Sequence, residues 1–116
     1  MTSTQLDIFS GLAEAPASGS GPSGEQHRRI LVALYNEGAR GLVAEECAQR
    51  CGMRASHIAA TRLIEMSAGH DERFPIPLVA RSEKKDRPTA SGRNAFRWFL
   101  TDVGRGVASD LLKEAA

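Results

Sequence analysis

Side chains that can hydrogen-bond to base edges recur at the spacing of one helix face within residues 54–64. A helix turns about 100° per residue, so positions three and four apart point to one side. His, Ser and Thr donate to or accept from bases, Arg pairs with guanine or a phosphate, and Ile contacts the thymine methyl group. The pattern predicts a surface that reads duplex DNA, and an amphipathic helix with a merely solvated polar face is the alternative. The outward side chains and those flanking them are Arg54, Ser56, His57, Thr61, Arg62 and Ile64.

A strongly basic segment follows at residues 81–97. It holds six basic residues against Glu83 and Asp86, a net charge of +4. Arg and Lys in a loop of this kind neutralise phosphates and release counterions. We expect phosphate contacts here, and the alternative is a loop kept soluble by its charge. The candidate side chains are Lys84, Lys85, Arg87, Arg93 and Arg97.

The sequence contains no residue pattern typical of a catalytic site or a metal site. Cys47 and Cys51 lie four apart on a predicted helix, and His57 and His70 do not complete a zinc spacing, so both cysteines are interpreted as small core residues. The segment 70–72 (His-Asp-Glu) has no partner nucleophile and is interpreted as a solvated loop. The sequence therefore predicts a protein that is not an enzyme, with no cofactor, no metal and no catalytic residue.

The first 24 residues divide into a short apolar motif and a tether. Residues 13–24 are rich in Gly, Ser and Pro, so a disordered tail is expected over 1–24, with one domain over 25–116. Before the tether stands QLDIF, which resembles the pentapeptide by which bacterial replication and repair proteins dock on the DNA sliding clamp. The resemblance implies that a clamp pocket takes these residues, whereas a helical spacing of Leu6, Phe9 and Leu12 would favour packing on the domain itself. The implied clamp-binding residues are Gln5, Leu6, Asp7, Ile8 and Phe9.

The base-reading candidates lie in a segment with helix-turn-helix spacing, residues 42–66. Ala48 allows two helices to approach closely, Gly52 supplies a positive φ, and Ile58 seats the second helix. The two helices are expected at 44–51 and about 55–68. The first of them lacks a Ser or Thr cap, since Val43 holds that position.

The remaining elements are expected to support this pair. A first helix over 25–37 presents Ile30, Leu31, Leu34 and Tyr35 to the core, with His27 on the surface and Gly38 as the stop. A minimal strand is expected at 41–43, and two strands at 78–82 and 95–100 enclose a loop over 84–94. A last helix begins after the cap Thr101 and runs to about 114.

This order of elements resembles the winged helix-turn-helix family of bacteriophages and bacteria. Residues 25–112 fit it, and RPTASGRNAFRWFLTDVGR resembles a wing with its following helix. The fold class is therefore expected to be α+β: three helices, a two-stranded wing hairpin and a C-terminal helix, with a disordered N-terminal tail. The resemblance implies major-groove contacts from residues 54–62 and backbone or minor-groove contacts from the wing.

Three functions follow from these patterns as hypotheses. The first is a non-enzymatic protein that binds double-stranded DNA and docks on the bacterial sliding clamp, modulating replication. The second is a transcriptional regulator that binds an operator as a homodimer through its last helix. The third is a protein-interaction module with a winged fold. The chain has no signal-peptide pattern or bilayer-spanning run, so a location in the bacterial cytoplasm, at the nucleoid, is expected without a membrane partner.

Overall fold

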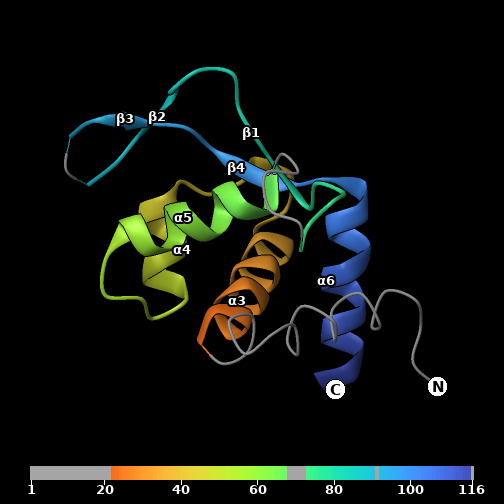
Figure 1. Ribbon diagram of the computed structural model, residues 1–116. Coiled ribbons are helices and arrows are strands. Elements are labelled where there is room, and N and C mark those ends of the chain that lie inside the picture. The colour runs from red at the N-terminus through yellow and green to blue at the C-terminus, as the bar shows by residue number, and fades with distance from the viewer. Residues whose placement is uncertain (1–21, 68–72, 91, 116) are drawn as a thin grey trace.

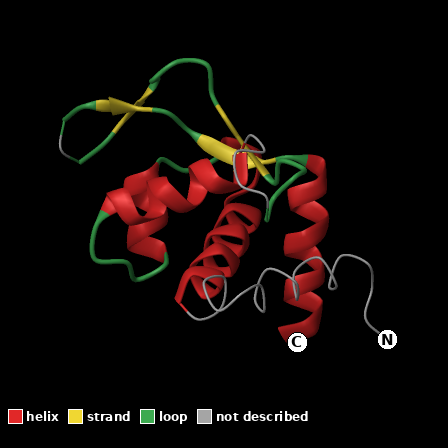
Figure 2. Ribbon diagram, in the orientation of Figure 1, coloured by secondary structure: helices red, strands yellow, loops and turns green. Residues whose placement is uncertain are grey.

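Helix α3 (Pro22–Glu37) is the central element of the fold, since it contacts all three other α-helices and a strand. The computed structural model describes residues 22–67, 73–90 and 92–115, and the clamp-like motif and most of the predicted tail lie outside these ranges. The described part has an α+β architecture in which four α-helices pack below small antiparallel sheets (Figures 1 and 2). This arrangement is compatible with a winged helix. None of the described helices is long and apolar enough to cross a membrane.

Helix α3 begins earlier than the sequence predicted. The tether was expected to run to Gly24, but residues 22–24 belong to the helix. Proline suits the first helical position because that N–H has no partner within the helix, and the burial of Gly24 favours ordered backbone there. At the other end, Gly38 has a φ of 84° and stops the helix as predicted. Tyr35, expected in the core, is 37% exposed.

The two helices of the predicted helix-turn-helix pack against each other and are α4 (Ala44–Arg50) and α5 (Ser56–Ser67). Gly52 has a φ of 70° in the turn between them, as predicted. The missing Ser or Thr cap is partly replaced, because Glu46 Oε1 accepts the Val43 N–H at 3.1 Å. The predicted apolar faces of both helices are buried, and their buried side chains are Cys47, Ala48, Ala59, Leu63 and Met66.

The wing contains two short antiparallel ladders where one hairpin with an open loop was predicted. Strand β1 (Val79–Arg81) pairs with β4 (Trp98–Leu100), placing Ala80 opposite Phe99. A second pair, β2 (Arg87–Pro88) with β3 (Asn94–Ala95), forms where the loop was expected over 84–94, and it includes Ala95, which was predicted to begin the second strand. At the minimal strand predicted over 41–43, Leu42 alone pairs, in an isolated antiparallel bridge with Trp98.

Helix α6 (Asp102–Ala115) packs antiparallel to α3 and closes the fold (Figure 1). Thr101 is its cap as predicted, since its hydroxyl oxygen accepts the Gly104 N–H at 3.0 Å. The same hydroxyl donates to the Pro77 carbonyl at 2.8 Å, which ties the helix start to the segment before β1. Gly104 is required there, because a Cβ would overlap the Leu78 carbonyl oxygen.

His27 is buried, which contradicts the prediction of a surface residue. Its Nε2 lies 2.8 Å from Glu65 Oε1, and its ring packs edge-on against Phe74 with centroids 4.8 Å apart. Arg62 and Arg73 also pair with Glu65, at 3.2 and 3.6 Å. Periodicity could not reveal this position, because the partners come from α5 and from the segment before β1. The cluster joins both of them to α3.

Acidification should destabilise the protein through His27. Burial lowers the pKa of this imidazole below 6.5 and outweighs the opposing effect of Glu65. The unfolded chain therefore binds the proton more tightly, and stability is lost as the pH falls through 6.5 toward the folded-state pKa. Urea denaturation from about pH 7.5 to about pH 5 should show the advantage of wild type over His27→Gln shrinking on acidification.

The matched control for this experiment is His57→Gln, at an exposed position outside the cluster. Its stability difference from wild type should not follow the same pH course. An advantage of wild type over His27→Gln that stays constant over the whole pH range would contradict the assignment.

Candidate nucleic-acid interface

The outward face of α5 presents most of the predicted base-reading side chains to solvent. Arg54, just before the helix, and Ser56, His57 and Thr61 are exposed, and Ile64 is 49% exposed. The Thr61 hydroxyl donates to the His57 carbonyl at 2.9 Å, so its oxygen is the group that remains for accepting a further hydrogen bond. This face combines donors, acceptors and one apolar contact, as the readout of base edges requires.

Arg62 was predicted to flank that face, and the structure places it elsewhere. Its side chain is 20% exposed and lies 3.2 Å from Glu65, in the cluster around His27. The guanidinium therefore supports the contact between α5 and α3. Arg62 is not brought together with Arg54 and His57.

Two glutamates at the start of α4 hold the wing against the helix pair. Glu46 Oε2 accepts a hydrogen bond from Arg87 at 3.0 Å, while its other oxygen caps α4. Glu45 Oε1 accepts the backbone N–H of Ala90, near the tip of the wing, at 2.9 Å. Arg87 also donates to the Gly41 carbonyl at 3.3 Å. We call these contacts the wing latch, and they explain why the hairpin tip extends over α4 and α5 in Figure 1.

Arg97 has a structural role within the wing. It forms two hydrogen bonds with the carboxylate of Asp86, at 3.0 and 3.2 Å, and a third with the Arg40 carbonyl at 3.1 Å. The hydrogen bond from Arg97 lowers the pKa of Asp86, so this carboxylate stays ionised. Arg87 and Arg97 are thus engaged within the protein, although the sequence grouped them with the phosphate-binding candidates.

The exposed cations of the wing are fewer than the sequence suggested. Lys84, Lys85 and Arg93 are exposed, as predicted. Arg81, which was counted in the basic segment but not chosen as a contact, is also exposed and stacks over Phe96 at 3.9 Å from the ring centroid. Its place in a strand that alternates outward and inward side chains was the signal available in the sequence.

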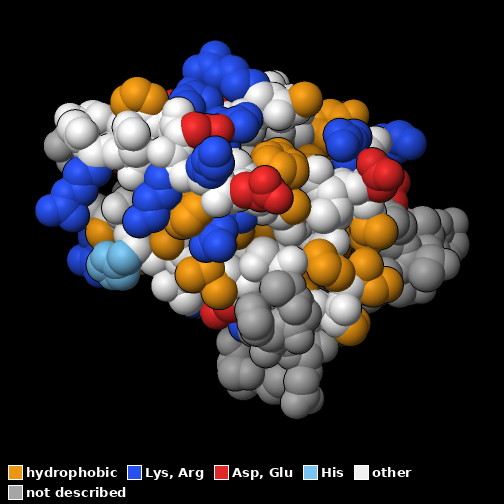
Figure 3. Space-filling model, turned by 90° about the horizontal axis from the view of Figure 1, so that it is seen from above, with side chains coloured by type: hydrophobic (Ala, Val, Ile, Leu, Met, Phe, Trp, Pro, Cys, Tyr) orange, Lys and Arg blue, Asp and Glu red, His pale blue; other side chains and the backbone are white. Residues whose placement is uncertain are grey.

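A groove of about 280 Å³ separates the wing tip from the helix pair. His57 and Ser56 line it from α5, and Arg93 and Asn94 line it from the wing. Thr89, Asn94 and Glu45 were missed as groove residues because their approach to α5 depends on the folding of the wing over α4. Seen from above in Figure 3, Lys and Arg side chains are most numerous over the half of the molecule that carries the hairpin.

The two cysteines are not reactive groups. Both are buried and free, as their interpretation as core residues requires. Burial raises the pKa of the Cys47 thiol to about 12 and also raises that of Cys51, which disfavours the thiolate needed for nucleophilic attack or metal binding. Within the described ranges, no three His, Cys, Asp or Glu side chains come close enough to hold a metal ion. The segment 70–72 lies outside those ranges.

Comparisons with protein-family models, with curated proteins and with solved structures gave no match for this chain. The assignment of function therefore rests on the geometry of the interface and on the sequence motifs.

The wing latch should contribute a measurable coupling energy. Arg87 and Glu46 side chains are 15% and 31% exposed, so solvent screens their interaction less than that of a fully exposed pair. A double-mutant cycle with Arg87→Gln and Glu46→Gln, measured by urea denaturation, should yield about 1 kcal/mol. Glutamine at position 46 retains an oxygen that can accept the Val43 N–H, so the cycle isolates the ion pair.

Arg29 and Glu25 provide the matched control pair, since their side chains are 55% and 51% exposed. Their coupling should stay below about 0.5 kcal/mol. Equal coupling energies for the two pairs would mean that the latch is no stronger than a surface ion pair.

Proposed function

We propose that the chain is a non-enzymatic, winged helix-turn-helix protein that binds double-stranded DNA. The observation that carries the proposal is the wing latch, which holds the basic wing beside the exposed polar face of α5. Arg93 of the wing and His57 of α5 line the same groove. A rigid pair of this kind suits duplex DNA, in which a helix enters the major groove while neighbouring loops contact the backbone.

The face of α5 and the wing have different roles in the proposed DNA contact. Ser56, His57 and Thr61 are the side chains that would meet base edges, and Ile64 would meet a thymine methyl group. Glu45 lines the groove and its carboxylate disfavours a phosphate there, so the phosphate contacts are assigned to the exposed cations of the wing. Those cations are Arg81, Lys84 and Lys85, whereas Arg93 lines the groove itself.

Removing two wing cations should weaken duplex binding and reduce its salt dependence. Each phosphate contact contributes about 0.9 to the slope of log K against log salt, so Lys84→Ala/Lys85→Ala should make the slope shallower by about 2. Fluorescence anisotropy with duplexes of mixed sequence, at several salt concentrations, measures both effects.

Arg29→Ala/Lys113→Ala is the matched control, since it removes the same charge from α3 and the far end of α6. It should leave the slope unchanged. Weak binding with no salt dependence in the wild-type protein would sink the proposal and favour a protein-interaction module. Cooperative binding to a palindromic site by a dimer in sedimentation would instead favour the transcriptional regulator.

A second proposed activity, docking on the bacterial sliding clamp, is supported by the sequence alone. QLDIF combines a glutamine with three apolar side chains, one before Asp7 and two directly after it, and an extended peptide can place such side chains in apolar subsites. The motif stands twelve residues before α3, so one chain could hold clamp and DNA at once.

Calorimetric titration against a bacterial sliding clamp tests this activity separately. Leu6→Ala/Phe9→Ala should weaken clamp binding at least about tenfold, because two apolar anchors are removed. Duplex affinity should stay unchanged in the same variant. Clamp binding that is equally tight in wild type and variant would exclude the motif as the docking element.

A further inference from the structure

A pocket of about 540 Å³ is separate from the groove beside the wing, since no residue in the described ranges lines both. It is formed by the end of α3, the 3-10 helix η1 (Gly38–Arg40), strand β4 and the first turns of α6. Its volume is in the range of about 300–1,000 Å³ that is usual for small-molecule sites. No residue assigned to DNA or clamp binding lines it.

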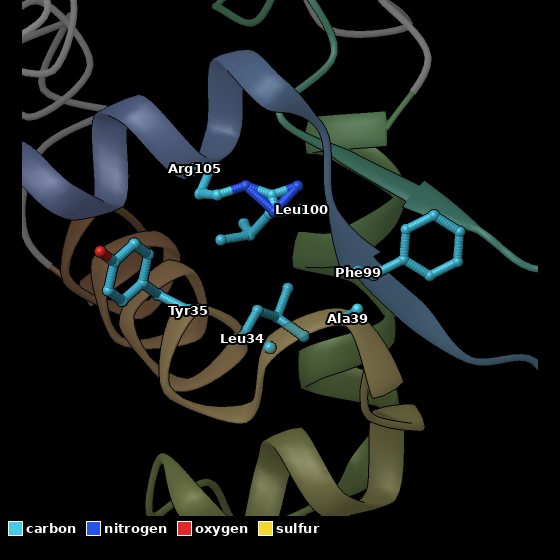
Figure 4. A pocket seen from close by; sticks show the side chains of 7 residues that line it. Leu34, Tyr35, Ala39, Phe99, Leu100 and Arg105 are labelled. Carbon is cyan, nitrogen blue, oxygen red and sulfur yellow. The ribbon is translucent and has the colours of Figure 1, made fainter.

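The pocket has an apolar floor and a partly polar rim. Leu34 and Leu100 form the floor and are 1% and 7% exposed. Tyr35 and Phe99 lie at opposite ends, with Ala39 of η1 beside Leu34 (Figure 4). A pocket of this shape can bury most of the apolar part of a ligand while one side of the ligand stays exposed to solvent.

Arg105 sets the charge of the pocket. It is the one ionised side chain among the described residues of the lining, and it extends from α6 across the pocket near Leu100 (Figure 4). Its ion pair with Asp102 is long, at 3.7 Å, and the Asp102 side chain is fully exposed, so water screens the pair strongly. The first turn of α6 adds positive potential, whereas the carbonyls at the end of α3 oppose it. The Arg105 guanidinium therefore makes the electrostatic potential of the pocket positive.

We propose that this pocket binds small amphipathic carboxylates, which have an apolar ring or chain and a single carboxylate group. The apolar ring or chain of the ligand packs on Leu34 and Leu100, and its carboxylate forms a bidentate hydrogen-bonded ion pair with Arg105. The proposal is independent of DNA binding.

The surroundings of the pocket favour a small molecule over a protein. Among the described residues, the large apolar side chains with high exposure are Tyr35, Ile64 and Ile76, and only Tyr35 borders the pocket. A stable protein interface buries more than about 1,000 Å² in total and needs a broader apolar centre. Tyr35 is therefore the one large, exposed apolar side chain among the described residues at the border of the pocket, which suits a small ligand that fills the pocket.

Titration of the full-length protein with 2-naphthoate, followed by NMR chemical shifts and calorimetry, tests the proposal. Naphthalene-2-carboxamide, which lacks the negative charge, should bind the wild-type protein about tenfold more weakly than 2-naphthoate. Arg105→Gln should bind 2-naphthoate about tenfold more weakly than wild type does, and its affinity for the carboxamide should be unchanged. Ala39→Trp, which places a bulky ring beside the floor, should abolish binding. Lys113→Gln, on the same helix but outside the pocket, should bind like wild type.

Four results would overturn the proposal: no binding of 2-naphthoate, equal affinities for the two compounds, no effect of Arg105→Gln, or shifts outside the pocket. Two further results would assign the pocket to another occupant. If 2-naphthoate bound only to the Leu6→Ala/Phe9→Ala variant, the N-terminal segment of the same chain would be the occupant of the pocket. If 2-naphthoate bound only after dilution of the protein, the occupant would be a second copy of the chain. Thermal unfolding of each variant separates lost binding from lost fold.

Discussion

Glu46 links the two parts of the candidate interface. One carboxylate oxygen caps α4 through the Val43 N–H, and the other holds Arg87 of the wing. Because Arg87 also donates to the Gly41 carbonyl, the wing, the segment before α4 and the start of that helix are joined at one point. The side chain that substitutes for a missing cap thus also orients the wing, and the position of the basic tip beside α5 depends on it.

The arginines of this small protein divide into structural and exposed groups. Arg87 and Arg97 bind carboxylates and backbone carbonyls inside the fold, and Arg62 pairs with Glu65 beside the buried His27. Arg54 and Arg93 are exposed on the side that carries α5 and the wing tip. The net charge of the wing therefore overstates the cations available to a nucleic acid, since every arginine that holds the wing in place is neutralised by a carboxylate of the same chain. Arg105, in the separate pocket, belongs to the exposed group, because its ion pair with Asp102 is 3.7 Å long and the Asp102 side chain is fully exposed.

Local patterns in the chain predicted the helix pair well. The spacing of Ala59, Leu63 and Met66 predicted the buried face of α5, and all three are fully buried. Gly52 and Gly38 adopt the positive φ expected of a turn and a helix stop, and Thr101 caps α6. These features depend on residues within a few positions of one another, where helix periodicity and capping chemistry act directly.

The sequence by itself therefore determined the α+β element order, the buried faces of the helices and the concentration of positive charge in one hairpin. Only the tertiary structure decided which charged side chains remain exposed. His27, Arg87 and Arg97 have partners between 11 and 57 positions away in the chain, and no local pattern identifies such partners. The same holds for the pocket, whose walls come from α3, β4 and α6 and exist only once those elements pack. Burial and ion pairing depend on distances across the fold, whereas periodicity and capping depend on distances along the chain.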